Sequence, residues 1–124
     1  MENITSILPE KNTVKEENTF NIISDKGNSF TISLKNYSQF IQINSFFQKN
    51  GLKTEYEKKF ILNDLSICES IDEIYEQLII EFKKETNKKL IEESNNIHII
   101  IPIDFIKIKE IKLTLDKKNF QIKR

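Results

Sequence analysis

The fold is decided by residues 70–85, which read SIDEIYEQLIIEFKKE. Ser70 and Glu73 match a capping box, in which the hydroxyl accepts from the Glu73 amide and the Glu73 carboxylate reaches back. Apolar side chains then recur at the i, i+3, i+4, i+7 spacing of one buried stripe. They are Ile71, Ile74, Tyr75, Leu78, Ile79 and Phe82. The pattern predicts an amphipathic helix over residues 71–85 with one face against a core.

The chain before this helix alternates like strands joined by tight turns. Four runs have apolar side chains at period two or nearly so, and they cover residues 20–23, 30–34, 38–47 and 52–62. Asn50-Gly51 is the strongest turn signal, because both residues accept positive φ. Residues 63–67 read as one short helical turn ahead of the main helix.

Three further strands are expected after the helix, over residues 89–93, 97–103 and 108–115. Residues 97–103 are almost continuous isoleucine, which is typical of a central strand buried on both faces. Pro102 lacks an amide proton, so it should end that strand or face an edge. A shift of apolar parity between Ile108 and Ile111 indicates a bulge or a turn.

A helix that follows a meander, instead of alternating with strands, favours an antiparallel α+β layer. We therefore expect an antiparallel curved sheet or small barrel of about seven strands, with a helical pair inserted after the fourth strand. At 124 residues the chain should form one domain. Residues 1–18 are expected to be a flexible or loosely docked tail, residues 19–116 the single α+β domain, and residues 117–124 a basic exit segment.

Composition excludes several classes of function. A single cysteine, Cys68, can supply neither an internal disulfide nor a cysteine-rich metal site, and no glycine-rich phosphate loop occurs. Nineteen basic and nineteen acidic side chains cancel, which argues against a non-specific nucleic-acid binder despite the lysine-rich residues 107–124. No apolar window is long enough to span a bilayer, and no signal peptide precedes the domain. We expect no cofactor, no metal and an intracellular, cytoplasmic location, with the cytoskeleton as one candidate.

Catalytic equipment is scarce, and no catalytic residue is expected. His98 is the only imidazole, and its neighbours Ile97 and Ile99 should point to the opposite face of their strand. A small hydrolase or transferase would use Cys68 or His98, and at least one of them would then line a cleft beside a titrating neighbour. A third alternative is a lipid- or small-molecule-binding cup enclosed by the curved sheet and the helix.

The preferred interpretation is a non-enzymatic protein-interaction or structural scaffold subunit that binds a protein partner or a second copy of itself. Its candidate partner surface comprises Phe46, Phe47 and Asn50. Adjacent phenylalanines on a strand point to opposite faces, so one of them should be exposed unless a partner covers it.

The order of elements resembles the globular head of a scaffold superfamily that includes the end-joining proteins of double-strand-break repair and the centriolar cartwheel protein. Those heads are antiparallel barrels with a helix-turn-helix between early and late strands, usually followed by a coiled coil. The matching stretches are residues 20–62, 63–85 and 89–115. The resemblance rests on this order and on no diagnostic motif, and it implies a scaffolding role. Such heads dimerise through exposed hydrophobic residues on a loop, to which Phe46-Phe47 is the nearest candidate.

Overall fold

The computed structural model describes residues 13–64, 69–84, 88–102 and 110–118. Its elements are β1 (Glu16–Ile23), β2 (Ser29–Asn36), β3 (Ile41–Lys49), β4 (Leu52–Phe60), the 3₁₀ turn η2 (Leu62–Asp64), α1 (Ile71–Lys83), β5 (Lys89–Glu92), β6 (Asn96–Pro102) and β7 (Glu110–Lys117). The seven strands form one antiparallel sheet in the order β1-β2-β3-β4-β7-β6-β5. The predicted fold class is confirmed, and η2 and α1 make up the helical insertion after the fourth strand.

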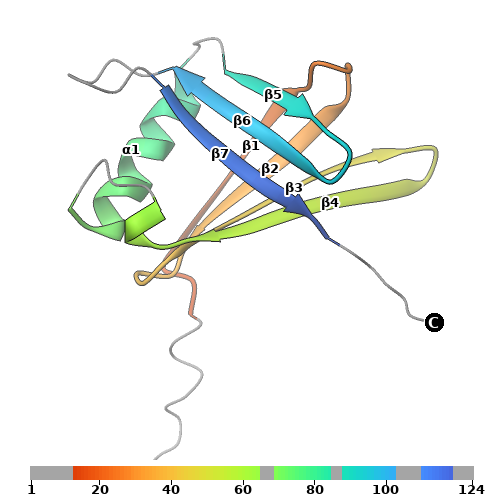
Figure 1. Ribbon diagram of the computed structural model, residues 1–124. Coiled ribbons are helices and arrows are strands. Elements are labelled where there is room, and N and C mark those ends of the chain that lie inside the picture. The colour runs from red at the N-terminus through yellow and green to blue at the C-terminus, as the bar shows by residue number, and fades with distance from the viewer. Residues whose placement is uncertain (1–12, 65–68, 85–87, 103–109, 119–124) are drawn as a thin grey trace, which may run out of the picture.

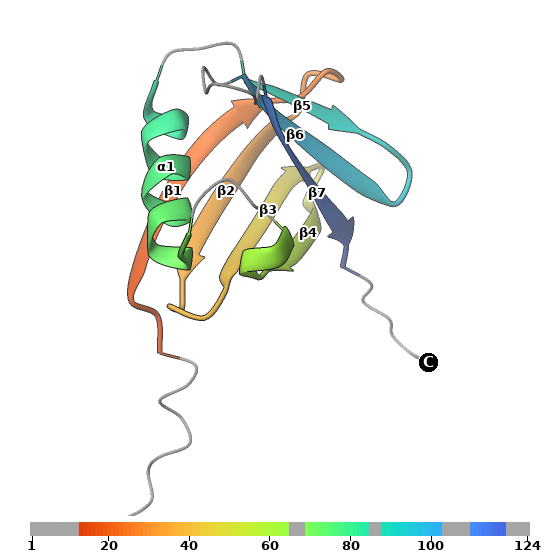
Figure 2. The same ribbon diagram turned by 60° about the vertical axis from the view of Figure 1, so that its left-hand side comes forward.

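The sheet curls into a half-barrel, and α1 lies across its open side (Figures 1 and 2). The predicted apolar stripe of α1 is buried along its whole length. The Tyr75 hydroxyl donates to the carbonyl oxygen of Leu34 on β2 over 2.8 Å. Phe82 stacks on Phe20 of β1, with ring centroids 5.2 Å apart. Helix and sheet therefore share one core.

Side chains on β2, β6 and β7 alternate between the core and the outer face. Ile97, Ile99 and Ile101 of β6 are fully buried, whereas His98 and Ile100 between them are only half-buried. The expectation that residues 97–103 form a strand buried on both faces is therefore wrong for β6. The physical reason is that α1 covers only the concave side of the sheet, so the convex face of β6 has no second layer (Figure 2).

The start of the first strand differs from the sequence pattern. β1 begins at Glu16, which pairs with Asn36, so the last residues of the expected tail over 1–18 belong to the first strand. The start was missed because these residues are polar and carry no apolar alternation. Pro102 is the last residue of β6, as its missing amide proton predicts. The expected bulge after Ile108, residues 1–12 of the tail and residues 119–124 of the exit segment lie outside the described residues.

The two edge strands, β1 and β5, are tied together at one end by the turn after β1. The amide of Asp25 donates to the carbonyl oxygen of Leu90 over 2.9 Å. The carboxylate of Glu92 accepts from the Ser24 hydroxyl over 2.5 Å and from the Asn28 side-chain amide over 2.7 Å. These bonds protect part of both edges, which would otherwise offer unpaired backbone groups to other chains.

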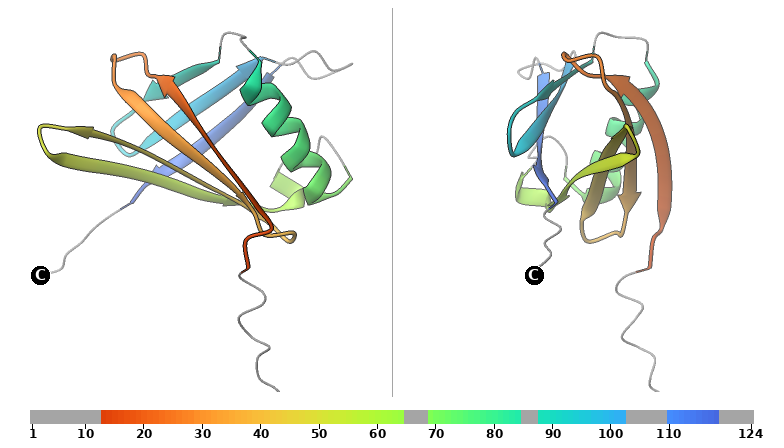
Figure 3. Two further views of the ribbon diagram at one scale, coloured as in Figure 1. Left: turned by 180° about the vertical axis from the view of Figure 1, so that it is seen from behind. Right: turned by 90° about the vertical axis from the view of Figure 1, so that its right-hand side faces the viewer.

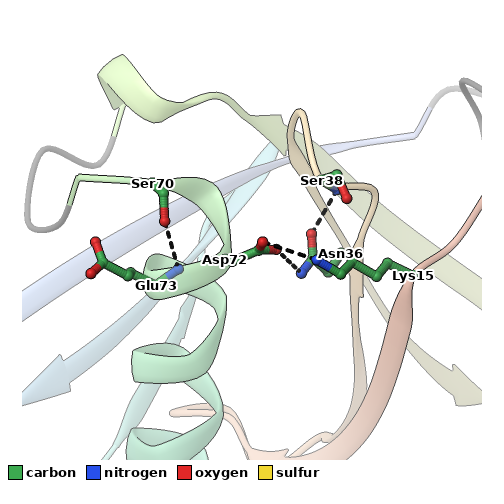
Figure 4. Close-up of polar contacts among 6 residues, drawn as sticks. All are labelled: Lys15, Asn36, Ser38, Ser70, Asp72 and Glu73. Atoms are coloured by element: carbon green, nitrogen blue, oxygen red, sulfur yellow. Dashed lines mark hydrogen bonds and ion pairs between the residues drawn. The ribbon is translucent and has the colours of Figure 1, made fainter.

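The start of α1 is fastened to the end of β2 (Figure 4). Ser70 Oγ accepts from the Glu73 amide over 3.2 Å, as the capping box predicts. Asp72 accepts from the Asn36 side-chain amide over 3.0 Å and from Lys15 Nζ over 2.9 Å. Asn36 is buried, and its own oxygen accepts from the Ser38 amide over 2.7 Å. One carboxylate thus joins the helix to the strand layer.

The Asp72 contact predicts a pH-dependent contribution to stability. The hydrogen bond from Asn36, and after it the bond and charge of Lys15, lower the pKa of Asp72 from 3.8. Because the folded pKa lies below the unfolded pKa, the contribution is present above the unfolded value and is lost as the pH falls through the folded value. Asp72→Ala should therefore destabilise the protein at neutral pH, and urea unfolding should show that the difference shrinks at about pH 2.5.

The matched control for this measurement is Glu76→Ala, a change at an exposed carboxylate on the same helix. Its effect on stability should stay nearly constant over the same range of pH. An Asp72→Ala effect of the same size at neutral and acid pH would show that the carboxylate charge contributes nothing.

Candidate functional site

The candidate surface lies on a hairpin, β3–β4, that extends beyond its neighbours. The two strands pair over nine positions, from Ile41 with Phe60 to Lys49 with Leu52. β2 pairs with β3 only as far as Phe46, and β7 pairs with β4 only at Tyr56 and Glu57. Residues 47–54, which we call the hairpin tip, therefore pair only with each other. The hairpin projects from the body of the sheet (Figure 3, left).

The turn of the hairpin has the geometry that its sequence predicts. Asn50 has φ 54° and Gly51 has φ 81°, so both central residues are left-handed. Lys49 and Leu52 are the last paired residues on either side, which leaves a two-residue loop. This loop fixes the register of the hairpin and hence the faces on which the two phenylalanines lie.

Phe46 and Phe47 point to opposite faces, and both are half-buried. Phe47 faces the core, where its ring lies 4.8 Å from that of Phe30. Phe46 lies on the outer face beneath Lys53, whose Nζ is 4.4 Å from the ring centroid. The expectation that one phenylalanine is exposed therefore needs correction, because a lysine from the same hairpin partly covers Phe46.

Lys53 also sets the local electrostatics of the hairpin. Its Nζ lies 3.1 Å from the Glu55 carboxylate. This hydrogen bond is the largest influence on Glu55 and, together with Lys118, it lowers the pKa of that carboxyl despite partial burial. The outer face beside Phe46 is therefore a mixed aromatic and charged surface.

Leu52 is the most exposed of the large hydrophobic side chains among the described residues, with 73% of its surface accessible. The sequence pattern predicts a strand that begins at Leu52 but does not mark this leucine as exposed. Its exposure follows from its position directly after Gly51, where neither β2 nor β7 reaches the hairpin. The Asn50-Gly51 turn was the sequence feature that could have predicted this exposure. Residues that flank the turn of a projecting hairpin have few neighbouring side chains to cover them.

His98 lies on the outer face of β6 in a cross-strand network. Its Nδ1 is 2.9 Å from the Thr114 hydroxyl and its Nε2 is 3.1 Å from the Glu93 carboxylate. Carboxylate, imidazole and hydroxyl occur in this order in hydrolytic triads, which also need a substrate cleft and oxyanion donors. His98 and Thr114 are directly opposite in the β6–β7 register, so cross-strand pairing accounts for the contact. Cys68, the other candidate of the hydrolase interpretation, lies outside the described residues.

Two of the surface clefts that described residues line have charged linings. One, of about 530 Å³, lies between β3, β4 and β7, and its lining includes Lys58, Lys59, Asp116, Lys117 and Lys118. The other, of about 290 Å³, lies where β1 meets the start of α1, and its lining includes Lys15, Glu16, Asp72, Glu73 and Glu76. Neither includes His98, and neither has the mainly apolar walls of a lipid or drug-sized site.

Comparison with protein-family models, with curated proteins and with solved structures found no match to the chain. The resemblance to scaffold heads therefore stays a prediction. Within the described ranges, no three histidine, cysteine or acidic side chains are grouped so as to hold a metal ion. In the same ranges, no helix has the length and apolar character required to cross a bilayer.

Proposed function

We propose that the chain is a non-enzymatic protein-interaction subunit of the scaffold kind, and that the hairpin tip is its contact surface. One observation carries the proposal: a leucine with 73% of its surface accessible stands at the end of a hairpin that neighbouring strands do not support. Burying a leucine side chain is worth about 1.5–3 kcal/mol, so a partner that covers Leu52 gains substantially. Two half-buried rings lie just behind it, that of Phe47 on the same face of the hairpin as Leu52 and that of Phe46 on the opposite face.

The backbone of the hairpin tip supports a contact with another protein chain. In the part of the chain that the structure describes, residues 47–49 of β3 have no strand partner opposite β4, and residues 52–54 of β4 have none opposite β3. Free strand edges of this kind recruit extended segments of other chains. A second copy of the chain and a different protein are both partners of this chemistry, and an intracellular, cytoplasmic or cytoskeletal assembly belongs to the same proposal.

No catalytic role is proposed for His98, because its two ring nitrogens are accounted for by Thr114 and Glu93 on the sheet surface. The cup alternative gains no support from the two clefts, whose linings are mainly charged.

Site-specific photo-crosslinking tests the proposed surface. A photoreactive phenylalanine analogue at position 52 should give a discrete crosslinked species in the source cell, identified by mass spectrometry as a second copy or a partner. The same analogue at position 23 is the matched control, because Ile23 is also exposed, at 62%, but lies on β1. Position 23 should give no such species.

Dependence on Phe46, the phenylalanine on the outer face of the same hairpin, sharpens this test. Phe46→Asp, in a chain that carries the analogue at position 52, should reduce the yield of the crosslinked species about tenfold, which corresponds to about 1.4 kcal/mol of binding. Equal crosslinking from positions 52 and 23, or a species that does not respond to Phe46→Asp, would contradict the proposed surface.

A further inference from the structure

The wall of the half-barrel splits where β4 meets β7. Only Tyr56 with Lys117 and Glu57 with Asp116 are paired between these strands, whereas β6 and β7 pair over seven positions. β4 continues from Lys58 to Phe60 with no partner on its β7 side among the described residues. The two strands diverge from the last shared pair in both views that show them side-on (Figures 1 and 3). Each therefore presents a strand edge toward the opening.

The cleft of about 530 Å³ lies at this point of divergence. Its lining carries four lysines, which are Lys58, Lys59, Lys117 and Lys118. Only two carboxylates, Glu57 and Asp116, oppose them, so the cleft has an excess of two positive charges (four minus two). The whole chain is neutral, so this excess is a local feature.

The ion pairs within the cleft are too long and too exposed to neutralise it. Lys58 Nζ lies 3.8 Å from Asp116, with 46% and 63% of the two side chains accessible. Lys118 Nζ lies 3.5 Å from Glu55 and 3.9 Å from Glu57, with 41% of the lysine side chain and 25% and 41% of the two glutamate side chains accessible. Exposed pairs of this kind are worth about 0–1 kcal/mol. Lys117 forms no ion pair with any described residue, so its charge is available to a ligand.

We propose that this cleft binds an extended acidic segment of a protein partner, which adds a strand to the free edge of β4. Two independent observations converge on this occupant. The unpaired strand edges select a peptide backbone, because backbone N–H and C=O groups are what such an edge can pair with. The four lysines select acidic side chains on that backbone.

The same observations favour a peptide over a nucleic acid. A phosphate backbone lacks the N–H and C=O groups that could continue the hydrogen-bond ladder of β4. The cleft is separate from the hairpin tip, so the proposal goes beyond the proposed function and does not depend on it. A scaffold subunit with both surfaces would contact two partners at once.

Peptide binding to the full chain tests the proposal. The probes are three fluorescein-labelled ten-residue peptides, measured by fluorescence anisotropy. One alternates Glu and Thr, one alternates Lys and Thr, and the third is the Glu-Thr peptide with N-methyl groups on every second backbone nitrogen. The Glu-Thr peptide should bind, and the Lys-Thr peptide should not. The N-methylated peptide should bind at least about tenfold more weakly, because it loses the ladder hydrogen bonds on one edge.

Charge reversal locates the site. The double variant Lys58→Glu/Lys117→Glu should weaken binding of the Glu-Thr peptide by about tenfold or more. The matched control is Lys26→Glu/Lys89→Glu, which reverses two exposed lysines, one in the β1–β2 turn and one on β5, and should leave binding within about twofold. If the first double variant unfolds, Lys58→Gln/Lys117→Gln removes the charges without reversing them and should weaken binding by a smaller factor.

Three results would overturn the proposal: no binding of the Glu-Thr peptide, equal loss in the control double variant, and equal binding of the N-methylated peptide. An oligothymidine that competes as well as the peptide would also overturn it, because simple attraction of anions would then replace strand addition. None of these outcomes affects crosslinking at position 52, so the proposals for the hairpin tip and for the cleft are tested independently.

Discussion

Replacing Ile99 with alanine is expected to lower the free energy of unfolding by about 3 kcal/mol, whereas the same change at Ile100 should cost about 1 kcal/mol or less. Ile99 is fully buried in the core, where its backbone pairs with Leu90 on one side and with Leu113 on the other. Its removal leaves a cavity that close-packed neighbours fill only in part.

Ile100 lies on the opposite face of the same strand and is only half-buried. Its partners in register are Lys89 and Lys112, whose aliphatic stems lie over the outer face of the sheet. Urea unfolding followed by circular dichroism gives both values, since the chain has no tryptophan to report by fluorescence. Equal losses at the two positions would mean that a second layer covers the convex face, as the isoleucine run alone suggests.

That run shows where sequence periodicity fails in this protein. Isoleucine occupies both parities of residues 97–101, at 97, 99 and 101 and again at 100. A pattern with apolar residues on both faces cannot reveal which face is covered, because cover is supplied by an element distant in sequence. Among the described elements the layer that covers the sheet is α1, and it lies on one side of it (Figure 2).

Sequence motifs correctly predict those structures that depend only on residues close together in the chain. The capping box at Ser70 and the apolar stripe after it predicted α1, and Asn50-Gly51 predicted the hairpin turn with both φ values positive. One detail differs at the helix start, where Glu73 accepts from the amide of Glu69 over 3.0 Å, one residue earlier than the capping box expects. Capping and turn interactions join residues that are only a few positions apart, so they form whatever the rest of the fold is.

Glu81 shows the converse. Its spacing of seven residues from Ile74 and three from Leu78 places it beside the buried stripe, but a carboxylate is seldom buried, and only 2% of its surface is accessible. One carboxylate oxygen accepts from Gln77 over 2.9 Å and from Lys84 over 3.1 Å, while the other has no hydrogen-bond partner. The periodicity of the helix therefore predicts the position of this residue but not the burial of a charged side chain.

The candidate surfaces depend on strand register in the same way. Leu52 is exposed because β2 and β7 stop short of the hairpin tip, and the basic cleft exists because β4 and β7 part after two residue pairs. Tyr56 and Lys117 are paired although they lie far apart in the chain. Phe46, Phe47 and Asn50 could be chosen from the sequence, whereas the lysine that covers Phe46 and the exposure of Leu52 could not.

The central claim is that the apolar stripe of α1 packs on the concave side of the bent sheet. Ile74 and Ile80 test it within one helix, because Ile74 is fully buried and Ile80 is 50% exposed on the opposite side. Alanine replaces isoleucine at both positions, so the gain in helix propensity, about 0.4 kcal/mol, is the same in each variant. Any difference between the two variants therefore reports packing against the sheet.

The difference between the free energies of unfolding of Ile74→Ala and Ile80→Ala, measured by urea denaturation, is the most direct test. Ile74→Ala should be less stable than Ile80→Ala by about 2–3 kcal/mol, with the same dependence on urea concentration in both. Values that agree within about 0.5 kcal/mol would show that the stripe does not face a core, and the account of the fold would then be wrong.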